Sequence, residues 1–121
     1  RFKEIGSTER VADVLTAMGE LALESGEHDG AMRHFLEALE LHRAFGDQGA
    51  VAACLIDIGA THWRAGRPEN AVGRLREAQM ICKDALKATN EPKRLAALAA
   101  APGELGQEAT RLRETLATKE E

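Results

Sequence analysis

The sequence predicts an all-α protein, a right-handed solenoid of about three antiparallel helical hairpins. The first observation behind this fold is an internal repeat, because shifting the 121-residue chain by 40 positions places small and apolar residues on one another. Such self-similarity is typical of stacked structural units. The second observation is that apolar residues recur within each unit at spacings of three and four, as on one face of a helix. The shift aligns Leu15 with Leu55, Gly19 with Gly59, Gly26 with Gly66, Ala31 with Ala71, and Glu37-Ala38 with Glu77-Ala78.

The first unit, residues 7–46, is predicted to hold two helices. An apolar stripe over residues 11–22 indicates the first helix, which Ser7 can cap and Gly26 can end. A second stripe over residues 31–45 follows after a very short turn. Two amphipathic helices joined this closely run antiparallel, so the unit is expected to form an αα-hairpin.

The second unit, residues 47–87, repeats this plan. Gly46 is expected to close the preceding helix, and Asp47 to cap the next one. Pro68 falls at a helix start, where its missing N–H removes no hydrogen bond. Because residues 1–6 align with the end of the first unit, we expect the chain to open in the last turn of a preceding repeat helix.

The third unit, residues 91–118, is expected to be a degenerate hairpin or a C-terminal cap. The 40-residue register decays after Leu86, but helical periodicity continues, which predicts helices over about 91–101 and 103–117. An alternative is a loosely attached helix or linker, since the segment contains a run of alanines. The outward side of a capping hairpin would be polar, with Glu108, Arg111, Glu114 and Lys119.

Gly19 and Gly59 occupy the same place in the two units. Glycine inside a helix costs about 1 kcal/mol relative to alanine, so its recurrence suggests a steric requirement. We expect the neighbouring helix to pass too close for a side chain at both positions, with small residues such as Ala31 and Ala71 opposite.

The order of these residues resembles the tetratricopeptide repeat, in which a Leu-Gly pair, a Gly and two Ala residues recur around bulky apolar positions. The longer unit and its Gly-Asp joint are similar to repeats of the kinesin light chain and Pins-type G-protein modulator groups, and to arrays of bacterial regulators. The resemblance implies a protein-interaction scaffold that binds a peptide or a partner helix in a concave groove. An alternative is a sensor or regulatory module of a larger signalling ATPase or transcription regulator. The matching residues are Leu15, Met18-Gly19, Ala22, Gly26, Ala31, Phe35 and Ala38, with Leu55, Ile58-Gly59, His62, Gly66, Ala71, Leu75 and Ala78.

The resemblance also implies which residues line this groove, because the first helix of each unit faces it. The set is acidic on the first unit and largely apolar on the second, so the expected partner carries basic and apolar residues. Trp63 is the favoured anchor, although packing between hairpins is an equal alternative for it. Relatives that clamp a terminal carboxylate use several basic groove residues, of which only Arg64 is present. The predicted groove residues are Asp13, Thr16, Glu20, Leu23, Glu24, Ile56, Ala60, Trp63 and Arg64.

Charge and composition disfavour other classes of function. Residues 1–60 carry 5 basic and 11 acidic residues, net −6, and residues 61–121 carry 11 and 9, net +2. Nucleic acid is therefore not an expected partner. No long apolar run or signal-peptide pattern occurs, so we expect a cytoplasmic protein without a membrane segment. Self-association is left open, because the first helix of an array exposes an apolar side.

Catalytic and metal-binding motifs are absent from the sequence. The four histidines form no paired ligand motif, and His62 is expected to be a buried residue in place of a family aromatic. Cys54 and Cys82 lack CxxC spacing and are expected to be reduced. The chain is therefore predicted to be no enzyme and to need no cofactor or metal.

Overall fold

Every element in the described part of the chain is an α-helix, as the sequence predicts. The computed structural model describes residues 2–81 and 92–120, with side chains over 9–81 and 96–114. Six helices lie in these ranges: α1 (Phe2–Glu24), α2 (His28–Phe45), α3 (Gln48–Arg64), α4 (Pro68–Gln79), α6 (Pro92–Ala99) and α7 (Gly103–Glu120).

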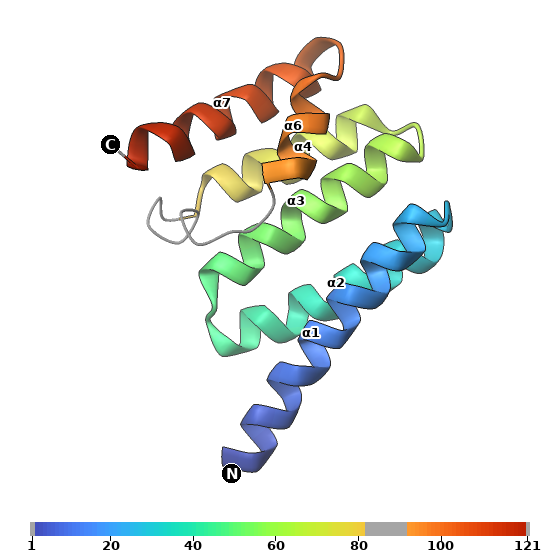
Figure 1. Ribbon diagram of the computed structural model, residues 1–121, viewed down its shortest axis with the longest axis vertical. Helices are drawn as coiled ribbons and strands as arrows, with labels where there is room; N and C mark the ends of the chain where they lie inside the picture. Colours follow the sequence, from blue (N-terminus) through green and yellow to red (C-terminus); the bar gives the residue numbers. More distant parts are fainter. Residues whose placement is uncertain (1, 82–91, 121) are drawn as a thin grey trace.

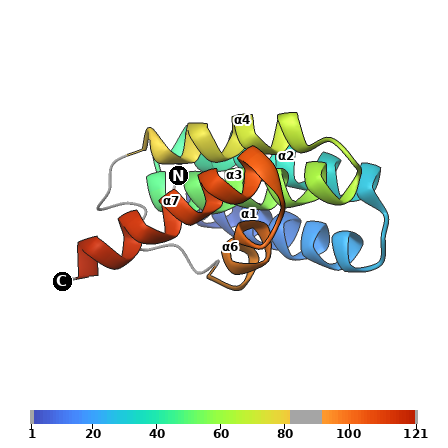
Figure 2. The ribbon, with the colours of Figure 1, turned by 90° about the horizontal axis from the view of Figure 1, so that it is seen from above.

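The helices form hairpins that stack as a helical solenoid (Figure 1). Helix α1 packs on α2, α3 on α4, and α6 on α7, while α2 also packs against α3 and so joins the first two hairpins. Seen from above, α2 and α4 lie on one side of the stack, and α1 and α6 on the other (Figure 2). This is the αα-hairpin array expected from the repeat.

The turns of the first two hairpins are each built on a glycine in the left-handed backbone region. Gly26 and Gly66 have φ angles of 82° and 83°, a conformation that side chains with a Cβ rarely adopt. Beyond each glycine, a backbone N–H returns to the preceding helix: Glu27 donates to Ala22 O at 2.9 Å and Arg67 to His62 O at 2.8 Å. These bonds satisfy carbonyls that the helix end would otherwise leave open. The predicted ends of the first helix in each unit are thus confirmed.

The joint between the hairpins is also as predicted. Gly46 closes α2 with a φ of 75°. The carboxylate of Asp47 accepts a hydrogen bond of 3.1 Å from the N–H of Ala50 and caps α3. Pro68 stands at the first position of α4.

The amino-terminal boundary differs from the prediction. Helix α1 runs unbroken from Phe2 to Glu24, whereas a separate helix end over residues 1–6 and a cap at Ser7 were expected. Gly6 does not adopt the left-handed conformation that ends α2 at Gly46. A glycine inside a helix costs only about 1 kcal/mol, and continuing the helix keeps the backbone hydrogen bonds of the turns on both sides.

Helix α3 is the centre of the core. It packs against α4, α2 and α6 and touches α1. A helix that is covered on several sides is expected to be mainly apolar around its circumference, and α3 is, with Asp57 and Thr61 as its buried polar residues. Its buried residues run without interruption from Cys54 to Thr61. Cys54 is buried, and Cys82 lies outside the described residues.

The two helical glycines have different surroundings. A Cβ on Gly19 would lie 2.6 Å from the Phe35 ring, so a side chain lacks room there as expected, but the obstacle is this ring and not a close helix backbone with small residues opposite. A Cβ on Gly59 would meet nothing closer than 3.5 Å, the carbonyl oxygen of Ala71. The expectation is therefore wrong for Gly59, because the residue that corresponds to Phe35 is Leu75, whose slimmer side chain leaves room at 3.6 Å.

The third hairpin is packed against the array. Helix α6 contacts α3, and α7 contacts α4. The turn between them is tight, since a Cβ on Gly106 would lie 2.0 Å from the carbonyl oxygen of Ala101. Leu98, Leu105 and Leu112 join the main core, which argues against a loosely attached linker. The predicted end of the second unit at residue 87 lies outside the described residues.

Candidate interaction groove

The predicted groove residues on α1 form an acidic surface. Asp13 and Glu24 are exposed, and Glu20 is half-buried. Thr16 lies between them, and its hydroxyl donates a 3.0 Å hydrogen bond to Ala12 O within the helix. Because positions 13, 20 and 24 differ by seven and four residues, the three carboxylates lie along one side of α1. This side can offer negative charge to a ligand.

The apolar members of the predicted set lie in the interior. Leu23 and Ile56 are 1% and 0% exposed, and Ala60 is 6% exposed. Each packs within the common core. Trp63 is half-buried and packs against the same core, so part of its indole remains accessible. Trp63 is therefore the apolar residue of the set with surface left for a ligand.

Arg64 links the two repeats at this surface. Its guanidinium donates a 3.3 Å hydrogen bond to the carbonyl oxygen of Leu23. This carbonyl belongs to the last turn of α1, where a cation also interacts favourably with the helix dipole. Arg64 thus holds the end of α3 beside the end of α1, next to Trp63 and the acidic side.

His62 stands where the family pattern has an aromatic residue, and it is half-buried. Its Nδ1 accepts a hydrogen bond of 3.1 Å from the Nε of Arg67, which requires this nitrogen to be unprotonated. Burial lowers the pKa of His62 below its ordinary value of 6.5, and the charges of Arg67 and Arg74 lower it further. His62 is therefore a neutral hydrogen-bond acceptor that joins the end of α3 to the start of α4.

Comparison with known families agrees with this architecture. The family model described as Tetratricopeptide repeat matches residues 10–84, which span α1, α2, α3 and α4. The chain belongs to the tetratricopeptide repeat family. Neither the curated proteins nor the solved structures contain a match. Proteins of this family typically mediate protein–protein interaction and are not catalysts.

One polar cluster of this tetratricopeptide repeat protein was not predicted. Glu108 was expected on the outward side of the third hairpin, but it is buried at the contact between α7 and α4. Its carboxylate accepts hydrogen bonds from Arg76 at 3.2 Å, Arg111 at 3.0 Å and Gln79 at 3.3 Å. Arg76 also pairs with Glu104. The alternation of charges in the sequence gave no sign that this one faces inward, because that depends on which side of α7 meets α4.

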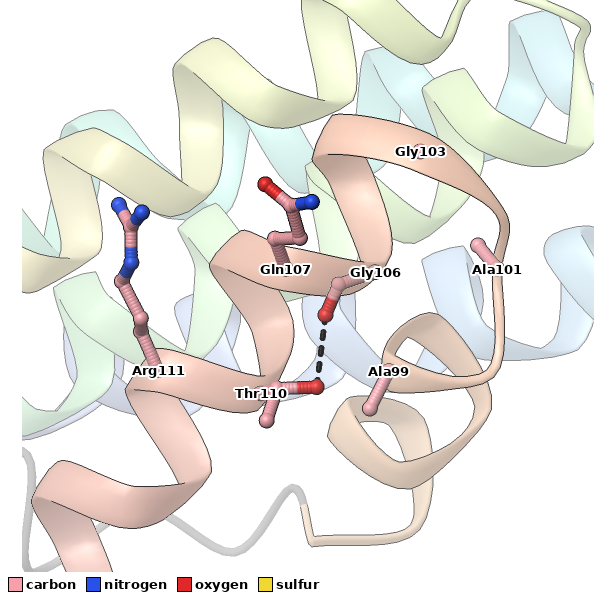
Figure 3. Close-up of a pocket in the computed structure, with 7 residues that line it drawn as sticks. All are labelled: Ala99, Ala101, Gly103, Gly106, Gln107, Thr110 and Arg111. Carbon is pink, nitrogen blue, oxygen red and sulfur yellow. Dashed lines mark hydrogen bonds between the residues drawn. The ribbon is translucent and has the colours of Figure 1, made fainter.

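Two of the surface depressions in the described part of the chain lie outside the predicted groove. The first is open and shallow and lies beside the α6–α7 turn, where Thr110 donates a 2.7 Å hydrogen bond to the carbonyl oxygen of Gly106 (Figure 3). The second lies between the two hairpin turns, and its rim includes His28, Asp29 and Arg67. Neither encloses a set of converging catalytic groups.

No group of three or more histidine, cysteine or carboxylate side chains is placed to hold a metal ion in the described ranges. No helix there combines the length and apolar character needed to cross a bilayer.

Proposed function

We propose that the chain is a protein-interaction scaffold that binds a basic, amphipathic segment of a partner along the acidic side of α1. The observation that carries the proposal is the contrast between the two first helices. The groove positions of α1 expose Asp13 and Glu24, whereas those of α3 are mainly buried apolar residues. A ligand on this surface therefore meets carboxylates first and reaches one large apolar side chain, Trp63.

The charge of the surface favours lysine and arginine on the partner. Residues 1–60 have a net charge of −6, which attracts a cationic ligand before contact and speeds association. Trp63 can cover an apolar residue of the ligand, because a half-buried indole loses little conformational entropy on binding. A peptide with an acidic end would instead be repelled by the carboxylates of α1.

The test uses two synthetic amphipathic peptides, one of leucine and lysine and one of leucine and glutamate in the same order. Binding is measured by the anisotropy of a dye on the peptide and by Trp63 fluorescence. We expect the chain to bind the lysine peptide and not the glutamate peptide. The Asp13→Lys, Glu20→Lys variant is expected to lose this binding.

The matched control carries the same change of charge on another helix. Glu37 and Glu40 are exposed on α2, and the Glu37→Lys, Glu40→Lys variant should bind the lysine peptide like the wild type. Equal weakening in both variants would show that the attraction is a property of net charge and would overturn the assignment to α1. Circular dichroism of each variant establishes that helix content is kept.

A further inference from the structure

A continuous apolar stripe is exposed on α1, on the side turned away from the core. Val11, Val14, Met18 and Leu21 form it, with exposed fractions of 49%, 57%, 42% and 68%. We call these four residues the α1 stripe. The other large apolar side chains found exposed in the described ranges, Leu36 on α2 and Met80 after α4, stand apart from it. A contiguous apolar surface on one helix is typical of an interaction site.

The next repeat shows what kind of surface this is. Forty residues on, the corresponding side chains of α3 are all buried. Helix α3 packs against α2 of the preceding hairpin, whereas the α1 stripe is exposed. The α1 stripe thus has the position and composition of a packing face, and it is open. The corresponding residues are Val51, Cys54, Ile58 and Thr61.

The stripe is complementary to itself. Its residues follow one another at spacings of three, four and three, a pattern that reads the same in both directions. If a second α1 lies antiparallel across a two-fold axis at the level of Thr16, Val11 faces Leu21 of the second copy, and Val14 faces Met18 of the second copy. Alternating spacings of three and four are the seam along which helices pair.

The charges beside the stripe fit the same arrangement. Arg10 and Glu24 are both exposed and lie on the same edge of α1, near its opposite ends. The two-fold axis keeps equivalent edges together and reverses the helix direction. Each Arg10 is therefore brought toward Glu24 of the second copy, whereas in a parallel two-fold pair these two residues would lie near opposite ends of the interface.

The other end of the array does not offer a match. The outward side of α7 is exposed and polar, with Gln107, Thr110, Arg111 and Glu114. Stacking α1 of one copy on α7 of the next would bury charges against the apolar stripe, which is costly. An open filament is thereby disfavoured, and a closed pair with one shared interface is left.

We propose that this chain forms a two-fold dimer in which the α1 stripes of two copies pack antiparallel. Four side chains from each copy make a small interface, so the dimer is a weak one. Sedimentation equilibrium of the 121-residue chain at concentrations up to about 0.5 mM covers the range in which such interfaces associate. The mass is expected to rise from 13.1 kDa toward twice that value.

Single substitutions test the surface. Val14→Glu or Leu21→Glu should keep the mass at 13.1 kDa over the whole range. Both residues are more than half exposed, so neither change should reduce helix content in circular dichroism. Met80→Glu is the matched control, since Met80 is 87% exposed outside the stripe, and this variant should dimerise like the wild type. A wild type that stays monomeric, or a control that loses the dimer, would overturn the proposal.

A charge exchange tests the antiparallel register. Arg10→Glu and Glu24→Arg are each expected to weaken the dimer about threefold to tenfold, the range of surface ion pairs that occur twice in the interface. The double variant restores opposite charges and should recover the wild-type dissociation constant. If the double variant is weaker than either single one, the copies do not pair in this way.

Discussion

The guanidinium of Arg64, at the end of α3, donates a 3.3 Å hydrogen bond to the carbonyl oxygen of Leu23, in the last turn of α1. The two residues are 41 positions apart, so the bond joins successive repeats. It is a polar tie between two helices whose packing contact is otherwise small. The turn end of one hairpin is thereby held against the next hairpin, beside the surface proposed to bind a partner.

Replacing Arg64 with alanine is expected to lower the free energy of unfolding by about 0.5–1 kcal/mol. This is less than the roughly 1.5–3 kcal/mol of a hydrogen bond to a charged group, because the side chain is exposed and water replaces part of the interaction. Urea denaturation measures the change. Arg113→Ala on α7, also exposed, is the control and should change the stability by less. An equal loss in both variants would mean that the bond to Leu23 contributes nothing.

The sequence predicted the hairpins because their signals are local. Gly26 and Gly66 had to adopt positive φ, Asp47 had to cap, and Pro68 had to start a helix, whatever surrounded them. These features need only a few neighbouring residues, and the structure contains each of them.

The groove was harder to predict because burial depends on distant elements. Ile56 and Ala60 occupy groove positions by analogy with the family, but α3 is surrounded by four helices and both side chains are buried. The same limit applies to Glu108, which faces inward because α7, the second helix of its hairpin, provides the contact with α4. The periodicity of a helix shows which residues share a face, but not which face is covered.

Gly19→Ala is expected to destabilise the protein by about 1–2 kcal/mol. The new methyl group would lie 2.6 Å from the ring of Phe35, which is fully buried and has little room to move. The cost of overpacking exceeds the gain of about 1 kcal/mol in helix propensity. Thermal or urea unfolding measures the difference.

The second repeat supplies the control and the rescue for this change. Gly59→Ala should be neutral or stabilising by up to about 1 kcal/mol, because the added Cβ meets ordinary contacts. Phe35→Leu copies Leu75 and should make room at Gly19. In a double-mutant cycle, the Gly19→Ala, Phe35→Leu variant should lose less free energy of unfolding than the two single variants together, by about 1 kcal/mol or more. Additive effects would show that the ring is not the obstacle.

The stability of the protein should depend on pH through His62. Burial and two nearby arginines lower its pKa in the folded state, while in the unfolded chain it returns to about 6.5. Between these two values the unfolded state binds more protons, so stability falls as the pH is lowered through this window. The stability that His62 contributes is fully present above its pKa in the unfolded chain, and it is lost progressively as the pH falls below that value.

His62→Gln removes this titration and keeps a side chain that can accept a hydrogen bond from Arg67. The free energy of unfolding is measured for both proteins from pH 8 to pH 5. The difference between wild type and variant should shrink or reverse toward acid pH as the wild type loses stability. A difference that is constant with pH would show that His62 titrates equally in both states.

Glu108→Gln is expected to destabilise the protein by about 1–3 kcal/mol. The carboxylate is 3% exposed and accepts hydrogen bonds from Arg76, Arg111 and Gln79, so it forms the polar centre of the contact between α4 and α7. An amide of the same size keeps one acceptor oxygen but turns a donor group toward the donors of its neighbours, and the loss of a buried charge partner carries a cost of this order.

The matched control for Glu108 is Glu104→Gln. Glu104 pairs with the same Arg76 but is exposed, so its removal should cost no more than about 0.5 kcal/mol. Urea denaturation in low and high salt distinguishes the two residues further. Salt should reduce the effect of Glu104→Gln on the free energy of unfolding more than that of Glu108→Gln, because it screens an exposed ion pair more than a buried one. If Glu108→Gln and Glu104→Gln have equal effects, the contact between α4 and α7 is held by its apolar residues, Leu105 and Leu112 among them, and not by the buried carboxylate.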